Sequence, residues 1–471
     1  MNLDLTSKPA APAGDPAAGA NPSLTETGRP LAQWVRTFAL RFGLLGLILL
    51  LAGCGDDDAP QRAVRVSNWL NAAVNPAFLS LERTFEREYE ANHPGVRLIS
   101  EPIPGPGRYA PKLLLAHLAG SVPDAGYLDA ASEAVFINNG VVADLMPFVR
   151  ADPDFSLDDY FPEIVSTFRR GDKLYGVPLD FTPMVIYYNR RIFQAAGVDE
   201  PRDGWTFDEF LATCAKLKAA QRDGKPVVEF PLYFENVMPF WICWIWNGGG
   251  DVLIEDGTRA SGALDSPQTI DAFHNLIALM FKHRYAPTLI ESAAAGVDMF
   301  RTARAAMDMK GHWMLLDYRA DGLDVGVVSI PTTLPRPVTV VYQSGLMVMS
   351  RAAEPQLGWE YVKHLTSESV QTRRVASGLA ISANRKAAAK YADSPLEQAF
   401  LRQMAYSRPQ WGTRVERYPY VEEVCQQTLK DLVSEIAEAR RYDGIYDDAK
   451  VRARIERALR DAAQRIDEFL R

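Results

Sequence analysis

The chain has 471 residues, enough for more than one domain, and 47% of them are hydrophobic while 23% are charged. This composition is typical of a globular protein with a sizeable core, and it excludes an intrinsically disordered chain. A formal net charge of −8 without a basic run argues against nucleic acid as a partner and provides no attraction to an anionic membrane surface.

The first predicted segment is an apolar run at residues 42–53, which follows Arg36 and Arg41. A membrane-spanning helix needs about 20 apolar residues, whereas the core of a signal peptide needs about 7–15. The run ends at Leu51-Ala52-Gly53-Cys54, which resembles the bacterial lipoprotein box. Residues 1–53 are therefore predicted to be a signal peptide, and the Cys54 thiol to carry the lipid. The alternative is a short membrane anchor or a buried helix that ends in cysteine.

The segments on either side of this run have different roles. Residues 54–62 are polar and predict a flexible tether between a lipidated cysteine and a folded body. Residues 1–30 are rich in Ala, Pro and Gly and make an unusually long leader. Residues 1–34 could be a mis-assigned start, because translation from a GTG codon at Val35 would give a leader of ordinary length. The alternative is a long but genuine leader. Either way the protein is expected outside the cytoplasm, held to the membrane through its lipid only.

The first part of the body alternates between strands and helices. Residues 63–69 predict a strand, and Asn75-Pro76 predicts the start of a helix with apolar residues at helical spacing, which ends at residues 92–95. A strand at 96–103, a helix at 108–119 and a strand after Pro123-Asp124 follow. This alternation predicts an α/β architecture.

The alternation continues through the second part of the chain. A buried strand is predicted at 184–188, and the spacing of Thr206 and Glu209 predicts a capping box that opens a helix at 207–221. Ser266-Pro267 opens another helix, which runs to about residue 283. Strands are predicted at 324–330 and 339–349, and the chain is mainly helical from residue 354 onward.

Motifs for metals, cofactors and nucleophilic catalysis are missing from the sequence. Beyond Cys54, the cysteines Cys214, Cys243 and Cys425 are too far apart for a metal or redox motif, and they allow at most one disulfide. The six histidines lack ligand spacing, and there is neither a phosphate-binding loop nor a nucleophile elbow. We therefore expect no metal and no cofactor, and we do not expect an enzyme.

Four pieces of sequence resemble one known family in the order in which they occur. They are Gly120-Ser121-Val122-Pro123-Asp124; residues 171–190, continuing to Trp205-Thr206-Phe207-Asp208-Glu209; residues 300–313, ending in Gly311-His312-Trp313; and residues 366–384. Together, behind a lipoprotein box, these pieces resemble family 1 of the bacterial extracellular solute-binding proteins, which serve sugar importers. One departure is Thr302-Ala303-Arg304, where the family usually has a glycine before a basic residue.

The resemblance implies a two-lobe α/β fold, the type II periplasmic-binding-protein fold, whose lobes are joined by three hinge crossings. By analogy the crossings are expected near 180–184, 290–297 and 341–346. Residues 63–181 and 291–341 would form lobe 1, and residues 182–290 and 342–471 would form lobe 2. The protein would be a monomer that captures a sugar by hinge closure and delivers it to the permease subunits of an ABC transporter.

A sugar presents apolar C–H faces and polar edges, so its site needs aromatic planes together with carboxylate and amide groups. Candidate ligand-binding residues lie at strand ends, at the expected crossings and in aromatic segments. They are Asn68, Trp69, Tyr127, Asp129, Asp180, Trp244, Trp313, Gln343, Ser344, Trp411 and Arg414. For each, a helix cap, a turn or core packing is the alternative, and most of Trp241–Trp246 is expected to be core.

Three other functions stay open at the level of sequence. A secreted sugar-acting enzyme would also combine aromatic residues with a close pair of acids. The same fold could bind another polar solute, such as a polyol or a glycerophosphodiester. A binding protein that serves a sensor receptor instead of an importer would have the same sequence features.

Overall fold

The computed structural model describes residues 62–70, 76–129, 132–378, 380–391, 393–443 and 445–471. All of them belong to one compact unit at residues 61–471. The predicted signal peptide at 1–53, Cys54, most of the tether and the cap at Asn75 lie outside the described residues.

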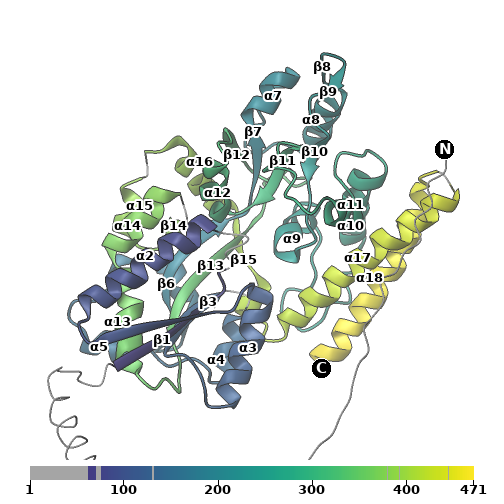
Figure 1. The fold of residues 1–471 in the computed structure, drawn as a ribbon. Coiled ribbons are helices and arrows are strands. Elements are labelled where there is room, and N and C mark those ends of the chain that lie inside the picture. The colour runs from purple at the N-terminus through teal and green to yellow at the C-terminus, as the bar shows by residue number, and fades with distance from the viewer. Residues whose placement is uncertain (1–61, 71–75, 130–131, 379, 392, 444) are drawn as a thin grey trace, which may run out of the picture. The chain divides into compact units, whose positions relative to one another are not determined.

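The first sheet has seven strands, and six of them run in the order β14-β6-β13-β3-β1-β2 while β15 pairs with the start of β13 (Figure 1). β1 is parallel to β2 and β3, whereas β13 is antiparallel to β3 and β6. The strands are β1 (Arg62–Asn68), β2 (Val96–Pro102), β3 (Ala125–Asp129), β6 (Val177–Pro183), β13 (Thr339–Val348), β14 (Ile381–Ser382) and β15 (Ser407–Pro409).

The second sheet has four strands in the order β10-β11-β7-β12. They are β10 (Phe230–Tyr233), β11 (Ala305–Lys310), β7 (Val185–Asn189) and β12 (Val325–Val328), and β7 is antiparallel to both of its neighbours. Two short hairpins complete the strands: β4 (Arg169–Arg170) with β5 (Lys173–Leu174), and β8 (Gln221–Arg222) with β9 (Lys225–Pro226).

Two helices of the first half begin at side-chain caps. The capping box predicted at Thr206 and Glu209 is present, and Asn189 caps the helix that follows β7. The helices are α2 (Pro76–Asn92), α3 (Pro106–Leu118), α4 (Glu133–Asn138), α5 (Met146–Ala151), α6 (Pro162–Thr167), α7 (Arg190–Ala196), α8 (Phe207–Ala219) and α9 (Met238–Asn247), with a 3-10 turn η1 (Leu157–Asp159).

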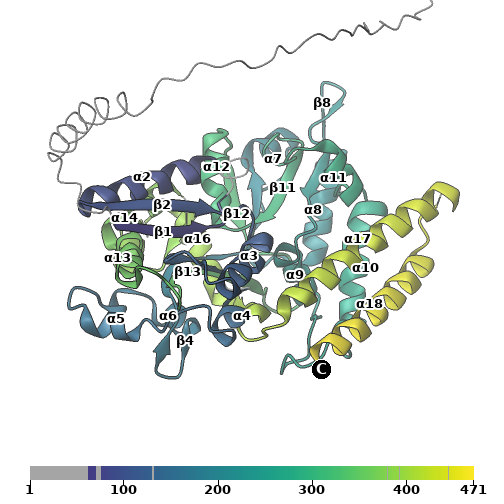
Figure 2. The ribbon, with the colours of Figure 1, turned by 60° about the horizontal axis from the view of Figure 1, so that its bottom comes forward.

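The second half is mainly helical from residue 355, as predicted. Ser266 caps α10, and Thr288 with Glu291 forms a second capping box that opens α11. The helices are α10 (Pro267–Phe281), α11 (Leu289–Ala295), α12 (Leu315–Ala320), α13 (Pro355–Thr366), α14 (Glu368–Ser377), α15 (Arg385–Ala389), α16 (Pro395–Gln403), α17 (Tyr418–Asp443) and α18 (Asp448–Leu470), with 3-10 turns η2 (His312–Met314), η3 (Met404–Tyr406) and η4 (Trp411–Thr413). The last two long helices, α17 and α18, lie side by side (Figure 2).

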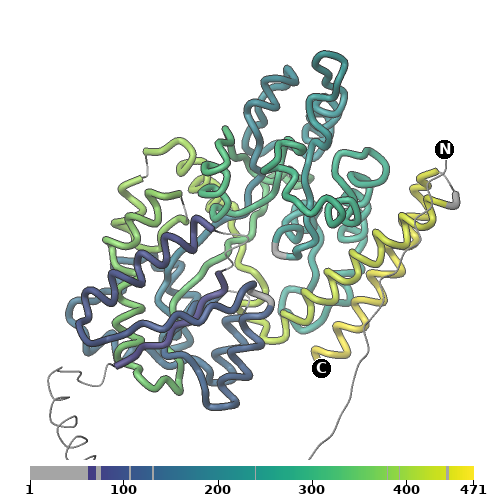
Figure 3. Tube along the Cα trace, viewed as in Figure 1, coloured from purple at the N-terminus to yellow at the C-terminus, as the bar shows by residue number. Residues whose placement is uncertain are grey.

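The buried hydrophobic side chains form two cores. The first core, which includes Val64, Phe85 and Val348, covers the first sheet, and α2 lies there beside α13 from the distant second half of the chain (Figure 3). The second core includes Trp241 and Phe273, and α8, α9, α10, α17 and α18 contribute to it. Alternate residues of β7 enter different cores, so the second sheet is covered on both faces.

The chain passes from one sheet to the other at positions that differ in part from expectation. β6 ends at Pro183 in the first sheet and β7 begins at Val185 in the second, so the chain changes sheet at Met184. However, β11 and β12 fall within residues 291–341, which were expected in lobe 1, and they pair with β7 in the second sheet. All of β13, including its part beyond residue 341, belongs to the first sheet.

Strand pairing locates one more passage between the sheets, between Val328 and Thr339. After Pro409 the chain leaves the first sheet and reaches α17, whose buried side chains belong to the second core. The sequence pattern located β7, β12 and β13 but missed β10 and β11. Periodicity also carries no information about which strand is the partner, and the expected crossings rested on analogy alone.

Three further observations limit the chemistry of the described residues. Cys214, Cys243 and Cys425 are buried free thiols, so none of them forms a disulfide with another. Among the described residues, none of the helices combines the length and apolar composition needed to cross a bilayer. Within the same residues, no group of His, Cys, Asp and Glu side chains is arranged to hold a metal ion.

Candidate functional site

A chain of buried polar groups connects the middle of the first sheet to two helices that cover it. The Tyr127 hydroxyl on β3 donates to Glu82 Oε2 on α2 at 2.7 Å. Arg374 on α14 donates one nitrogen to Glu82 and another to Asp180 Oδ2 on β6, the latter at 2.9 Å. Ser344 on β13 donates its hydroxyl to Asp180 Oδ1. Three residues predicted for the site, Tyr127, Asp180 and Ser344, therefore belong to one network.

Strand register explains why Asp129, Asp180 and Ser344 come together. Ser344 on β13 pairs with Asp129 of β3 on one side and with Asp180 of β6 on the other. Residues directly opposite each other in a sheet point to the same face, so the three side chains share one face. The ladder between β13 and β6 shifts register after Ser344, and such irregularities are common beside functional sites.

Burial governs the charges in this network. It raises the pKa of Asp180 to about 7, against the lowering effect of the hydrogen bond from Ser344. Burial lowers the pKa of Arg374 to about 9, which still leaves the guanidinium protonated at neutral pH. The phenol pKa of Tyr127 is raised well above its ordinary value by the same cause. Arg374 is thus the cation that neutralises two buried carboxylates, Glu82 and Asp180.

Trp313 lies where the two cores meet. Its half-buried ring packs against both cores, with Phe240 of α9 at 6.0 Å and Tyr342 of β13 at 6.4 Å between ring centroids. A Cβ atom on Gly311 would lie 2.1 Å from the Trp313 ring, so only glycine permits this packing. Next to the ring, the buried Lys310 ammonium pairs with Glu235 and lies 4.5 Å from the centre of the Phe240 ring.

Asn68 and Trp69 border the polar network from the end of β1. The Asn68 side chain accepts a hydrogen bond from the Leu70 amide at 3.0 Å, which fixes the turn after the strand. The Trp69 ring stands edge-to-face against Tyr109 and Tyr127, with centroids 5.4 and 5.0 Å away. Trp69 is half-buried, so one part of its ring remains accessible.

The Gln343 side chain lies near a second cluster of polar side chains, around Glu133 of α4. Its carboxamide nitrogen is buried and makes no hydrogen bond of good geometry to another described residue, although the amide lies near enough to Glu133 to lower that group's pKa. Burial outweighs this and raises the pKa of Glu133 to about 8, even though Arg170 donates to Glu133 at 3.0 Å. Asp129 accepts hydrogen bonds from the amide and hydroxyl of Ser132 at the start of α4, at 2.8 and 3.2 Å.

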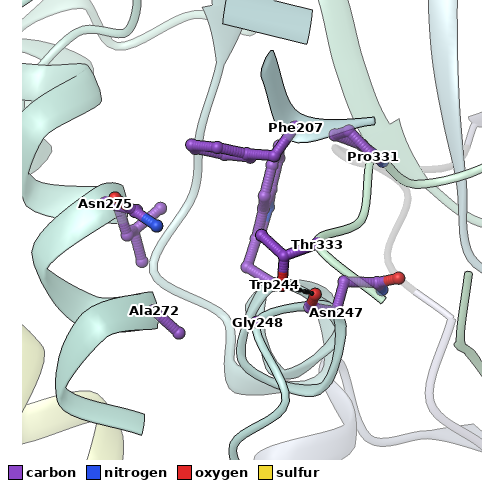
Figure 4. Close-up of a pocket in the computed structure, with 9 residues that line it drawn as sticks. Phe207, Trp244, Asn247, Gly248, Ala272, Asn275, Pro331 and Thr333 are labelled. Carbon is purple, nitrogen blue, oxygen red and sulfur yellow. Dashed lines mark hydrogen bonds between the residues drawn. The ribbon is translucent and has the colours of Figure 1, made fainter. Parts of the chain in front are cut away.

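Trp244 lies apart from this group, in the second core, whereas the segment of Trp411 and Arg414 is connected to it through Arg170, which also donates to the Thr413 carbonyl at 2.8 Å. Trp411 is fully buried and donates its indole nitrogen to Asp251 Oδ1 at 2.9 Å, while Arg414 covers its ring at 4.1 Å. Trp244 is buried against Phe207 and Phe210 and lines a small pocket between α8, α9 and α10 (Figure 4). Trp241 and Trp246 are also buried, so most of this aromatic segment is core, as expected.

Sequence reasoning missed several residues that organise these groups. Glu82 is an acidic residue on the buried face of α2, together with Phe85 and Tyr89, and that position was a readable signal. Arg374 lies with Val370 and Val375 on the buried face of α14, which was a similar signal. Asp251 gave no such signal, because it follows three glycines and its role as acceptor for Trp246, Trp411 and Arg408 depends on tertiary contacts.

The arrangement can bind a polar ligand by hydrogen bonds and stacking. Carboxyl, hydroxyl and amide groups cluster around Ser344, and aromatic rings flank them at Trp69 and Trp313.

Comparisons with known proteins agree with this arrangement. Residues 69–372 match the family described as bacterial extracellular solute-binding protein. An uncharacterized ABC transporter extracellular-binding protein of Pyrococcus horikoshii is 23% identical over 432 residues, which cover 84% of this chain and 91% of the relative.

Solved structures show the same fold at low sequence identity. An ABC substrate-binding protein from Listeria monocytogenes, in complex with cycloalternan, has a TM-score of 0.73 and 18% identity over 87% of this chain and 99% of its own. The GacH receptor of Streptomyces glaucescens, solved unliganded and with acarbose, has a TM-score of 0.70 and 19% identity over 86% of this chain and 99% of its own. The predicted two-lobe periplasmic-binding-protein fold is thereby confirmed. By its sequence match and its fold, the chain belongs to the family of bacterial extracellular solute-binding proteins.

Proposed function

We propose that the protein binds a sugar or oligosaccharide outside the cytoplasm and delivers it to an ABC importer. The observation that carries this proposal is the position of Trp313, whose ring packs on both cores beside Phe240 and Tyr342. An aromatic plane at the junction of two lobes suits the apolar face of a sugar ring. Carboxyl and hydroxyl groups of Asp129, Asp180 and Ser344 on neighbouring strands suit its hydroxyls.

The relatives support the same class of ligand. The Listeria protein was solved with cycloalternan and the Streptomyces receptor with acarbose, and a saccharide ligand for this chain agrees with both. A ligand between the lobes gains contacts to both only when they close, so it shifts the population toward a closed state. The permease of the importer would then recognise the closed form.

A thermal-shift screen of the purified protein tests the ligand class. Mono- and oligosaccharides, polyols and a glycerophosphodiester are added at millimolar concentration, because a ligand that binds only the folded state raises the melting temperature. We expect the largest increase from a sugar. A larger increase from a glycerophosphodiester, or release of hydrolysed sugar from the incubated sample, would contradict the proposal and favour another solute or an enzyme.

We further propose that Cys54 carries a lipid anchor. The support is the Leu51-Ala52-Gly53-Cys54 sequence after a short apolar run, because several acyl chains on one cysteine hold a protein durably at a membrane. Replacement of Cys54 by serine should abolish labelling with a radioactive fatty acid, whereas Cys214→Ser, at a buried free thiol, should leave the labelling intact. Equal labelling of both variants would refute the anchor.

A further inference from the structure

Several buried polar atoms near the first half of β13 make no hydrogen bond of good geometry to another described residue. They belong to Glu133, Gln343, Gln410 and Glu422. Gln410 directly follows β15, which pairs with the start of β13, and Glu422 lies near Tyr342 of β13, whose pKa its charge raises in addition to the larger effect of burial. Buried polar groups in native proteins are almost always paired, so the polar groups of a bound ligand can be accommodated here.

Glu422 differs from the other three residues because it lies on α17, a helix of the second core. Its neighbours Val421 and Val424 on α17 are buried in the second core, whereas the adjacent Glu423 is exposed. The Glu422 carboxyl nevertheless lies close to Asp129, at the end of β3 in the first sheet. Glu422 also lies beyond residues 69–372, the part of the chain that matches the family.

The surroundings of Glu422 suit the hydroxyl groups of a ligand and disfavour a ligand that carries negative charge. The titratable groups that face it are Asp129, Tyr342, Tyr418 and Cys425, and no described cation is hydrogen-bonded or ion-paired with it. Burial, with a contribution from the Asp129 charge, raises the pKa of Glu422 to about 8. At neutral pH this carboxyl can therefore both donate and accept a hydrogen bond, as a sugar hydroxyl requires.

We propose that Glu422 is a specificity-determining residue of the binding site: its carboxyl group hydrogen-bonds the hydroxyls of a neutral sugar and, together with Asp129, excludes ligands that carry a carboxylate or a phosphate. The inference rests on the proposed function and deepens it, because it narrows the substrate class to uncharged saccharides. Helix α17 thus contributes selectivity that residues 69–372, the part of the chain that matches the family, do not contain.

Binding of paired neutral and anionic probes tests the inference. Glucose, galactose and maltotriose are compared with glucuronate and galacturonate by calorimetry, using wild type, Glu422→Gln, Glu422→Leu and the matched control Glu423→Gln. We expect wild type to bind a neutral probe at least about 100-fold more tightly than its anionic counterpart, because like charges across a contact repel. Glu422→Leu should weaken neutral binding by about 10-fold or more, since it removes the hydrogen bonds.

The remaining variants separate the effect of the Glu422 charge on binding from the effect of its side-chain shape. Glu422→Gln keeps the shape and, like the protonated carboxyl, can donate and accept hydrogen bonds, so neutral and uronate binding should both stay within about 3-fold of wild type at pH 7. At pH 9, where the wild-type carboxyl is ionised, the uronate should bind about 10-fold more tightly to the variant than to wild type. The Glu423→Gln control should match wild type for every probe. Wild-type affinities in both Glu422 variants, or tighter binding of a uronate by wild type, would overturn the inference while leaving a sugar-binding function intact.

A measurement without ligand keeps the two proposals distinguishable. A buried carboxyl that is unpaired when no ligand is bound destabilises the folded protein. Glu422→Leu should therefore raise the melting temperature of the unliganded protein by about 2 °C. A lower melting temperature than that of Glu423→Gln would show that Glu422 has a structural partner and would overturn the inference. If no sugar binds to wild type, the proposed function fails, and this measurement still decides the role of Glu422.

Discussion

At the scale of single residues, Trp313 connects the packing of the protein to its proposed ligand. Its ring lies over the backbone at Gly311 and beside Phe240 and Tyr342, so it is held in place while one part of it stays accessible. A residue that contacts both cores is affected by any movement of one lobe relative to the other.

Replacement of Trp313 by alanine should weaken sugar binding by about 1–3 kcal/mol, the free energy of losing a buried aromatic contact. Calorimetry with the sugar that gives the largest thermal shift measures this loss. Because the ring is only half-buried, the unliganded variant should still unfold cooperatively. Loss of the cooperative transition without a change in affinity would instead make Trp313 a core residue.

Ala303 occupies the position where the family usually has glycine, and its backbone adopts a left-handed conformation with φ of 56°. This conformation strains any residue with a Cβ atom, and the exposed methyl group has no packing to lose. Ala303→Gly should therefore increase the free energy of unfolding by about 0.5–1 kcal/mol, measured by urea denaturation. Ala389→Gly on α15 serves as the control and should be destabilising, since its helical backbone does not need glycine.

The raised pKa of Glu422 predicts a pH dependence with a definite sign. Folded Glu422 keeps its proton up to a pH of about 8, whereas a glutamate in the unfolded chain loses it near its usual value of about 4. The folded state binds more protons in this window, so its stability falls as pH rises. Glu422→Gln lacks this effect, so the free energy of unfolding of wild type relative to the variant should fall by about 1–3 kcal/mol from pH 5 to 8. Parallel stability curves would contradict the prediction.

At the scale of elements, α14 is attached to α2 by two neighbouring arginines in different environments. Arg374 is buried and neutralises Glu82 and Asp180, whereas Arg373 forms a partly exposed pair with Glu88. The desolvation of the buried pair is compensated only while both signs of charge are present.

Arg374→Met should destabilise the protein by about 3–5 kcal/mol, because it leaves two buried carboxylates without a cation. Arg373→Met is the matched control, and it should cost at most about 1 kcal/mol, since its ion pair is screened by solvent. Urea denaturation of both variants measures the difference. Similar losses for the two variants would show that Arg374 does not neutralise the network.

At the scale of the whole molecule, the chain passes between the two sheets twice and then passes from the first sheet to the helices of the second core. The passages lie between β6 and β7, between β12 and β13, and after β15. Hydrogen bonds also connect α4 to the third passage: Asn138 and Asn139 donate to Glu416 at 2.8 and 3.0 Å. Few covalent connections and exposed polar contacts permit hinge motion.

Saturating sugar should reduce the radius of gyration, because the ligand contacts both lobes only in a closed state. Small-angle scattering with and without the sugar that gives the largest thermal shift measures this change. Trp313→Ala at the same sugar concentration is the control and should remain closer to the unliganded value. An unchanged radius of gyration in saturated wild type would contradict hinge closure.

The sequence by itself determined the local structure and the family. Caps such as Thr206 with Glu209 and the periodicity of β1 and α2 are local properties, set by hydrogen bonds and spacing within a few residues. Asp180 and Ser344 could be selected because they lie in segments that the family resemblance associates with hinges, and both belong to one network.

Only the tertiary structure decided which strands pair and which polar groups meet. The placement of β11 and β12 beside β7 depends on long-range packing, and strand periodicity is the same for any partner. Arg374 reaches Glu82 across 292 residues of sequence, and Glu422 approaches Asp129 from a helix near the C-terminus. Such contacts bring together groups whose local sequence gives no sign of each other, because burial and neighbouring charge exist only once the chain has folded.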